Sequence, residues 1–231
     1  MARRIDVSAY LVLGPENTLG RPVGDIVSQA LAAGFTCVQV RSKECSAREL
    51  IACTGAAAEA IARAGAQGEA ALLVDDRLDV ALAAREAGIA VDGVHVGQSD
   101  IPVEVCRKLL GPDAIVGLSA RTEEMLAYVR TADLGLVDYL GVGPLHETET
   151  KRDCGLDASG KVVTKSLDDI AALAAASPVP IVVGGGVKAA DLPALRATGA
   201  DGFFVVSAVC AAADPGAAAR ELVKAWHDAA R

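Results

Sequence analysis

The sequence predicts a single (β/α)8 TIM barrel, an α/β fold that takes in residues 1–231 as one domain. Short apolar, β-branched runs alternate with alanine-rich runs along the whole chain, which is the pattern of repeated βα units. Eight such pairs in 231 residues are close to the usual size of this barrel. An open doubly wound sheet is the alternative, but no G-x-G-x-x-G motif follows the first run.

The eight strands are predicted from short runs rich in β-branched and other apolar residues. They are expected at residues 6–13, 36–41, 71–75, 93–96, 115–119, 139–143, 180–184 and 202–206.

Helix start signals occur between these strands, as residues that accept hydrogen bonds from a helix's first backbone N–H groups or fit its first turn. The signals are Ser46 with Glu49, Thr122 with Glu123 and Glu124, Ser166 with Asp168 and Asp169, and Asp214 with Pro215.

Composition excludes several classes of protein. The mean hydropathy of +0.35 reflects 46 alanines among 231 residues, and no apolar run approaches the roughly 20 residues of a membrane-spanning helix. A net charge of −8 and seven aromatic residues argue against a nucleic-acid binder. Asp6 and Ser8 interrupt the start of the chain where a signal peptide needs an apolar stretch, so we expect a cytoplasmic protein. The sequence leaves monomer and homo-oligomer open.

The six cysteines never form a C-x-x-C pair, so a zinc site or redox dithiol has little support, and free thiols are expected. Cys154 is the one thiol placed where reactivity would be expected, because it lies in a long polar connection. That connection, residues 145–165, far exceeds the roughly 2 to 6 residues of ordinary βα loops and is typical of a functional loop or lid.

Chemistry in such a barrel gathers at the carboxyl ends of the strands. The cations Arg41, Lys43 and Lys151 and the carboxylates Asp76 and Asp100 fall at these ends. Carboxylates without nearby histidine or cysteine suit Mg²⁺, which is normally completed by waters and substrate phosphate oxygens. Each aspartate also precedes a predicted helix, so either one taken alone fits an N-cap equally well.

A second set of residues predicts a monophosphate site. Gly184, Gly185 and Gly186 end the seventh predicted strand, and Ser207 follows the eighth. Loops after these two strands often present backbone N–H groups to phosphate, and glycine allows a close approach. His95, in a strand between apolar neighbours, is interpreted as a satisfied core histidine rather than a ligand.

The ordered set of these motifs resembles the thiamine phosphate synthase family over nearly the whole chain. The matching pieces are Gln39-x-Arg41-x-Lys43, Asp76, Gly97-Gln98-x-Asp100, Ser119, Gly141-x-Gly143-Pro144, Thr148-x-Thr150-Lys151, Gly186 and Val206-Ser207. The resemblance implies a transferase that joins 4-amino-2-methyl-5-hydroxymethylpyrimidine diphosphate to hydroxyethylthiazole phosphate, giving thiamine phosphate and diphosphate.

The resemblance also implies a role for each site residue, with Lys43, Ser119 and Lys151 as the catalytic ones. The pyrimidine diphosphate would be held by Gln39, Arg41, Lys43, Asp75, Ser119 and Lys151, and Mg²⁺ by Asp76 and Asp100. The thiazole phosphate would be held by Thr148, Glu149, Thr150, Gly186, Val206 and Ser207.

Two features depart from the family pattern. Asp75 stands where the family usually has asparagine; an ionised carboxylate accepts but cannot donate a hydrogen bond, and it adds negative charge beside the metal. The segment between Asp76 and Asp100 is a few residues longer than usual, which we assign to an extended helix and turn around residues 84–90.

Two rival functions remain open at this point. A thiazole tautomerase-like relative would lack the full diphosphate set and would have Gly-His where this chain has Gly143-Pro144. A non-catalytic barrel that senses a thiamine precursor would be expected to have lost Asp76, Asp100 or Lys151, all of which are present.

Overall fold

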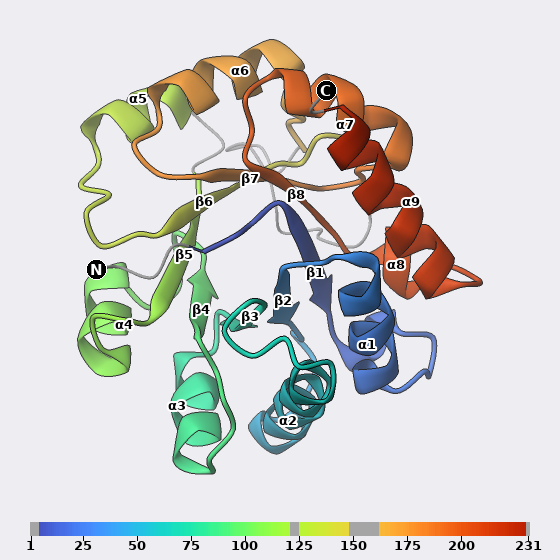
Figure 1. The fold of residues 1–231 in the computed structure, drawn as a ribbon. Helices are drawn as coiled ribbons and strands as arrows, with labels where there is room; N and C mark the ends of the chain where they lie inside the picture. Colours follow the sequence, from blue (N-terminus) through green and yellow to red (C-terminus); the bar gives the residue numbers. More distant parts are fainter. Residues whose placement is uncertain (1–4, 121–124, 148–161, 230–231) are drawn as a thin grey trace.

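The computed structural model describes residues 5–120, 125–147 and 162–229, and these form a closed barrel of parallel strands in the order β1 to β8. The predicted (β/α)8 fold is therefore confirmed, and the open sheet is excluded. Figure 1 shows helices arranged around the strands. The strands are β1 (Ala9–Leu13), β2 (Cys37–Val40), β3 (Ala71–Asp75), β4 (Gly93–Val96), β5 (Ile115–Ser119), β6 (Tyr139–Val142), β7 (Ile181–Val183) and β8 (Gly202–Val205).

All eight predicted strands are present, with some ends shorter than expected. The helices are α1 (Val23–Ala33), α2 (Ala47–Arg63), α3 (Leu78–Glu86), α4 (Val103–Leu110), α5 (Met125–Thr131), α6 (Leu167–Ala176), α7 (Leu192–Ala197), α8 (Ser207–Cys210) and α9 (Pro215–Asp228), with 3-10 turns η1 (Pro15–Asn17) and η2 (Ala189–Asp191).

Three of the predicted helix starts are confirmed. The side chains of Ser46 and Ser166 each form a capping box, and the Asp214 carboxylate accepts a hydrogen bond from the Ala217 N–H at 2.8 Å. The fourth signal, at Thr122, lies outside the described residues. The helix α3 ends at Glu86 and a turn through Gly88 follows it, so both the helix and the turn expected around residues 84–90 are present.

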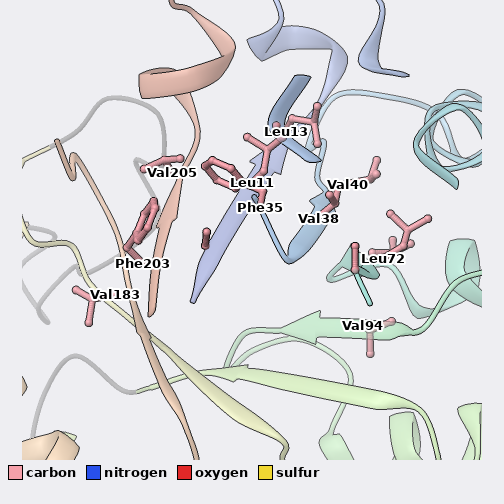
Figure 2. Close-up of a cluster of buried hydrophobic side chains, with 14 of the residues drawn as sticks. Leu11, Leu13, Phe35, Val38, Val40, Leu72, Val94, Val183, Phe203 and Val205 are labelled. Atoms are coloured by element: carbon pink, nitrogen blue, oxygen red, sulfur yellow. The ribbon is translucent and has the colours of Figure 1, made fainter. Parts of the chain in front are cut away.

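The strands alternate their side chains between the barrel interior and the surrounding helices, as the two-residue period of a strand requires. Figure 2 shows the outer set, in which Leu11, Val38 and Leu72 point from the strands toward the helices. The inner set forms a second cluster that includes Tyr10, Leu73 and Tyr139. On the strands that carry the site, the inward-facing positions nearest the carboxyl end hold polar residues. The same strand register that packs the barrel interior therefore also brings these polar residues together.

Side-chain clamps join neighbouring strands at their amino ends. Thr36, Asp92, Asp138 and Asp201 each directly precede an even-numbered strand. In every case the backbone N–H of the clamp residue donates to the carbonyl of one residue on the preceding odd-numbered strand. The side-chain oxygen of the clamp residue accepts from the backbone N–H of that same strand residue. Two strands are thereby fixed by a pair of bonds at each clamp.

The residues Ala70, Ala114 and Pro180, which precede β3, β5 and β7, have no side-chain acceptor, so the clamps repeat once per pair of βα units. Among the described residues, no helix is long and apolar enough to cross a membrane.

Candidate active site

The predicted site residues of β2, β3 and β5 come together with His95 of β4 at the carboxyl ends of these strands. Gln39, Asp75, His95 and Ser119 occupy inner positions near the ends of four neighbouring strands, and Arg41 directly follows β2. Gln39, Arg41, Asp75 and His95 are buried, whereas Ser119 is half-buried. A parallel barrel aligns strand ends that are far apart in sequence, which is why spacing alone could not give these contacts.

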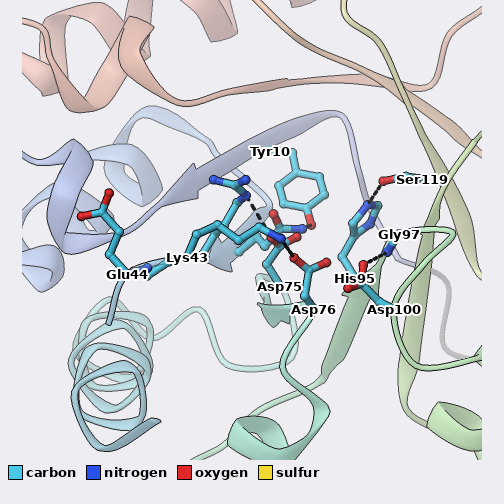
Figure 3. A network of polar contacts seen from close by, with 12 residues as sticks. Tyr10, Lys43, Glu44, Asp75, Asp76, His95, Gly97, Asp100 and Ser119 are labelled. Carbon is cyan, nitrogen blue, oxygen red and sulfur yellow. Dashed lines mark hydrogen bonds and ion pairs between the residues drawn. The ribbon is translucent and has the colours of Figure 1, made fainter. Parts of the chain in front are cut away.

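Asp76 lies at the centre of a charged group. Its carboxylate pairs with the Lys43 ammonium and faces the carboxyl group of Asp100 (Figure 3). The Asp76 backbone has φ of 57°, in the left-handed region that a non-glycine residue adopts only at a cost. Its N–H donates to the His95 carbonyl at 2.7 Å, which fixes this turn against β4. Such a turn directs the side chain toward Asp100.

The two carboxyl groups have pKa values displaced in opposite directions. For Asp76, hydrogen bonds from Lys43 and Asp100 outweigh the effect of burial and lower its pKa. For Asp100, burial and the neighbouring Asp76 raise its pKa. Two carboxyl groups this close together are a donor set suited to a hard divalent cation.

Within residues 5–120, 125–147 and 162–229, no group of three or more histidine, cysteine or acidic side chains is arranged to hold a metal ion. Two carboxylates nevertheless fit Mg²⁺, because this ion is commonly held by one or two carboxylates together with waters and phosphate oxygens.

Neither aspartate is a helix cap, so that alternative is wrong. The N-cap residue of α3 is Arg77 and that of α4 is Pro102, and neither helix has a side-chain cap bond. The Asp100 carboxylate instead accepts from the Gly97 N–H at 2.8 Å, within the turn that follows β4.

Arg41 and Asp75 form a buried ion pair. The Arg41 Nε lies 3.0 Å from Asp75 Oδ2, and both side chains are less than a tenth exposed. The charge of this guanidinium, to which the family resemblance assigns a diphosphate, is thus balanced by a carboxylate from the neighbouring strand. This pairing gives Asp75 a partner that the sequence did not reveal.

A continuous row of hydrogen bonds crosses the barrel interior below these charges. The Gln39 amide donates to the Tyr10 hydroxyl at 2.7 Å, and the Tyr10 and Tyr139 hydroxyls are 2.8 Å apart. His95 Nδ1 lies 2.8 Å from the Tyr139 hydroxyl, and His95 Nε2 lies 3.0 Å from Ser119 Oγ. The histidine is therefore satisfied on both ring nitrogens, as interpreted from the sequence.

Two inner glycines make room for this row. A Cβ atom at Gly117 would lie 2.2 Å from the Tyr139 ring, and one at Gly141 would lie 2.9 Å from the His95 ring. Any larger residue at Gly117 would clash with the tyrosine ring, which has little room to move in a packed interior.

The glycine-rich end of β7 lies beside the chain that leaves β6. Gly185 and Gly186 have φ of 85° and 72°. The Leu145 N–H donates to the Gly184 carbonyl and the His146 N–H donates to the Gly185 carbonyl, both at 2.9 Å. Ser207 begins α8 and is exposed, while Val206 is half-buried. These residues occupy the ends of neighbouring strands, as the monophosphate prediction requires.

The remaining residues of the prediction lie outside the described part of the chain. They are Thr148, Glu149, Thr150 and Lys151, together with Cys154. The five described cysteines are free, as expected.

Comparison with known proteins decides the family. The model of a family described as thiamine monophosphate synthase matches residues 9–209. The chain belongs to the thiamine monophosphate synthase family. The family predicted from the sequence motifs is confirmed.

Similar proteins include thiamine-phosphate synthases from two named organisms. A thiamine-phosphate synthase of Laribacter hongkongensis is 41% identical over 223 residues, covering 96% of each chain. One from Moorella thermoacetica is 42% identical over 213 residues, covering 92% of each chain. The similarity runs along nearly the full length of each protein.

Among solved structures, a thiamine phosphate pyrophosphorylase from Pyrococcus furiosus superposes with a TM-score of 0.76 at 28% identity, covering 98% of each chain. A 3-hexulose-6-phosphate synthase from Salmonella typhimurium superposes with a TM-score of 0.63 at 19% identity, covering 96% of this chain and 100% of the other, and shows the shared barrel alone.

Sequence reasoning missed two residues of this family member's site region. Tyr10 and Tyr139 were not among the predicted site residues, yet their hydroxyls link Gln39 to His95. The available signal was their inner-face position in strands whose next inner residues are polar. Lys165, which was not singled out, is buried, and burial lowers the pKa of its ammonium group.

Proposed function

We propose that this chain is a thiamine-phosphate synthase that joins an aminopyrimidine-methyl diphosphate to a thiazole phosphate. The family membership and the synthase names of relatives near 40% identity support this transferase activity. The observation that carries the proposal is the meeting of Lys43, Asp76 and Asp100 at neighbouring strand ends, because a cation and two carboxylates suit a diphosphate with its metal.

The leaving diphosphate would lie against Arg41 and Lys43, with Lys151 completing the set of cations. Asp76 and Asp100 would hold Mg²⁺, and that ion would neutralise charge on the departing diphosphate oxygens. Ser119 and Gln39 would supply uncharged hydrogen-bond groups to the same substrate. Much of the catalysis is then positioning and charge stabilisation by groups already in place.

The reaction needs no base for its nucleophile. The bond from the methylene carbon to the diphosphate oxygen breaks, and the electron pair leaves with diphosphate. The thiazole nitrogen then forms the new carbon–nitrogen bond with its own lone pair, leaving the positive charge on the thiazolium ring. Since that nitrogen carries no proton, no histidine or carboxylate is required to remove one.

The thiazole phosphate would bind at Gly186, Val206 and Ser207, with Thr148, Glu149 and Thr150 completing the pocket. The left-handed backbone at Gly185 and Gly186 supports this assignment, because successive N–H groups in such turns can converge on an anion. We also place this biosynthetic reaction in the cytoplasm.

The test is an assay of the purified protein with Mg²⁺ and both precursors, in which thiamine phosphate and diphosphate should form in equal amounts. Product should disappear when either precursor or the metal is omitted. Asp100→Ala should lower turnover strongly while the melting temperature changes little. Binding of the thiazole phosphate without any product would instead favour the sensor, and the proposed activity would be wrong.

A further inference from the structure

The row of hydrogen bonds across the barrel interior forms a relay of five residues, Gln39, Tyr10, Tyr139, His95 and Ser119. The protons that each group carries fix which group donates and which accepts at every step of the relay. Both phenols are buried, and burial raises the pKa of each, so each hydroxyl keeps its single proton. An amide nitrogen can only donate. The Tyr10 oxygen therefore accepts from Gln39, and its own proton is free to reach Tyr139.

The proton on the Tyr139 hydroxyl also determines which ring nitrogen of His95 is protonated. The Tyr139 oxygen accepts from Tyr10, so the Tyr139 proton points to His95 Nδ1 at 2.8 Å. A neutral imidazole that accepts at Nδ1 carries its proton on Nε2, which donates to Ser119 Oγ at 3.0 Å. A doubly protonated His95 would donate at both nitrogens and would leave the Tyr139 proton without an acceptor within the relay. The thiol of Cys37 also contacts the Tyr10 hydroxyl but is a weak partner.

In this direction, one end of the relay offers a hydrogen-bond acceptor to a ligand and the other end offers a donor. The Oε1 atom of Gln39 is buried and has no hydrogen-bond partner among the described residues, so it presents an acceptor. Because Ser119 Oγ accepts from His95, its hydroxyl proton is available to donate outward. Turning the Gln39 amide over would reverse every bond and would make Ser119 donate to His95 instead.

We propose that this relay couples the two ends of the pyrimidine diphosphate subsite, so that an amine donor bound at Gln39 sets Ser119 as a donor toward a phosphate oxygen. The identity of the ligand rests on the proposed function, whereas the direction of the relay does not. Tyr10, Tyr139 and His95 are positioning residues that touch no substrate. The relay thereby favours an aminopyrimidine over a ring that presents a carbonyl oxygen at the same place.

The direction is tested by the ¹⁵N NMR spectrum of the imidazole in the ligand-free protein. The chain has three histidines, and His95→Gln identifies the His95 signals. The native protein should show His95 neutral with its proton on Nε2. Gln39→Glu places a carboxylate, which accepts only, beside Tyr10, so the relay should reverse and the proton should move to Nδ1. An Nδ1 proton in the native protein, or no change in Gln39→Glu, would overturn the proposal.

Kinetics provide a second test should Gln39→Glu fold poorly. Tyr139→Phe should lower kcat/KM for the pyrimidine diphosphate by about 10-fold, the size of one lost hydrogen bond, with KM for the thiazole phosphate unchanged. Ser119→Ala should cost about 10- to 100-fold in the native background and much less in Tyr139→Phe. Additive losses would contradict coupling. Tyr128→Phe, which removes a phenol on α5, is the matched control and should change nothing.

The two proposals fail in different ways. A histidine proton that moves as expected in a protein that makes no thiamine phosphate would keep the relay and reject the proposed function. Product formation with a histidine proton that stays in place would keep the function and reject the relay.

Discussion

At the residue scale, Asp76 combines an unfavourable backbone with a favourable position. Its left-handed φ of 57° is shared among described non-glycine residues only with Leu19, at 53°. Leu19 is an exposed residue, whereas Asp76 faces Lys43 and Asp100. An unfavourable backbone conformation next to a group of charged side chains is typical of functional sites.

The strain at Asp76 can be measured with two substitutions. Asp76→Gly and Asp76→Ala lose the same carboxylate contacts, but only glycine adopts positive φ freely. We expect the glycine variant to have a free energy of unfolding about 1 kcal/mol higher than the alanine variant, with turnover lost in both. Chemical denaturation measures the difference. Leu19→Gly and Leu19→Ala are the matched pair and should differ in the same direction with full activity.

The buried Arg41–Asp75 pair leads to a second expectation. Asp75→Asn removes the charge that balances Arg41, so the diphosphate should bind up to about tenfold more tightly, while the melting temperature falls because the guanidinium loses its buried counter-charge. Calorimetry with the pyrimidine diphosphate measures the affinity. Asp79→Asn breaks the exposed pair with Arg77 and should leave both quantities unchanged. Weaker binding in Asp75→Asn would show that its carboxylate serves the substrate directly.

At the scale of elements, the helix starts follow local rules. The side chain of Asp214 caps α9, whose buried Leu222 and Trp226 anchor the helix to the barrel. Asp214→Ala should lower the free energy of unfolding by about 1 kcal/mol because one N–H at the helix start loses its acceptor. Thermal unfolding checks this, and Asp214→Ser should restore most of the loss. Unchanged stability in the alanine variant would mean that packing alone fixes this helix.

Local rules explain what could be predicted from the sequence. Capping boxes, strand runs and the strand-end positions of Asp76 and Asp100 depend on a few neighbouring residues. The pairing of Arg41 with Asp75 and the linkage of Tyr10 with Tyr139, 129 positions apart, depend on the barrel's register. Sequence spacing carries no information about that register until all eight strands are placed. The assignments of Asp76 and Asp100 to magnesium, and of the other residues to substrate, stay predictions.

In the molecule as a whole, the carboxyl ends of the strands carry the candidate site, and the amino ends carry the clamps that stabilise the barrel. Asp138 clamps β5 to β6 and also accepts from Arg107 at 2.7 Å, on the side opposite the site. Asp138→Ala leaves the Val116 N–H and Arg107 without this acceptor. It should lower the free energy of unfolding by about 1 to 3 kcal/mol, with kcat changed less than twofold. Urea unfolding and the product assay measure both, and Asp138→Asn should have the smaller effect. A large fall in kcat would show that the two ends are coupled.

The clamps have one more consequence, for where the chain can be opened. Each clamp lies between an odd-numbered strand and the even-numbered strand that follows it, so every clamp belongs to one continuous stretch of chain. Circular permutants with new termini before β3, β5 or β7 keep all four stretches intact, whereas termini placed before β2, β4, β6 or β8 divide one. At the amino ends of its strands, the barrel is therefore clamped in four quarters, each made of two consecutive strands.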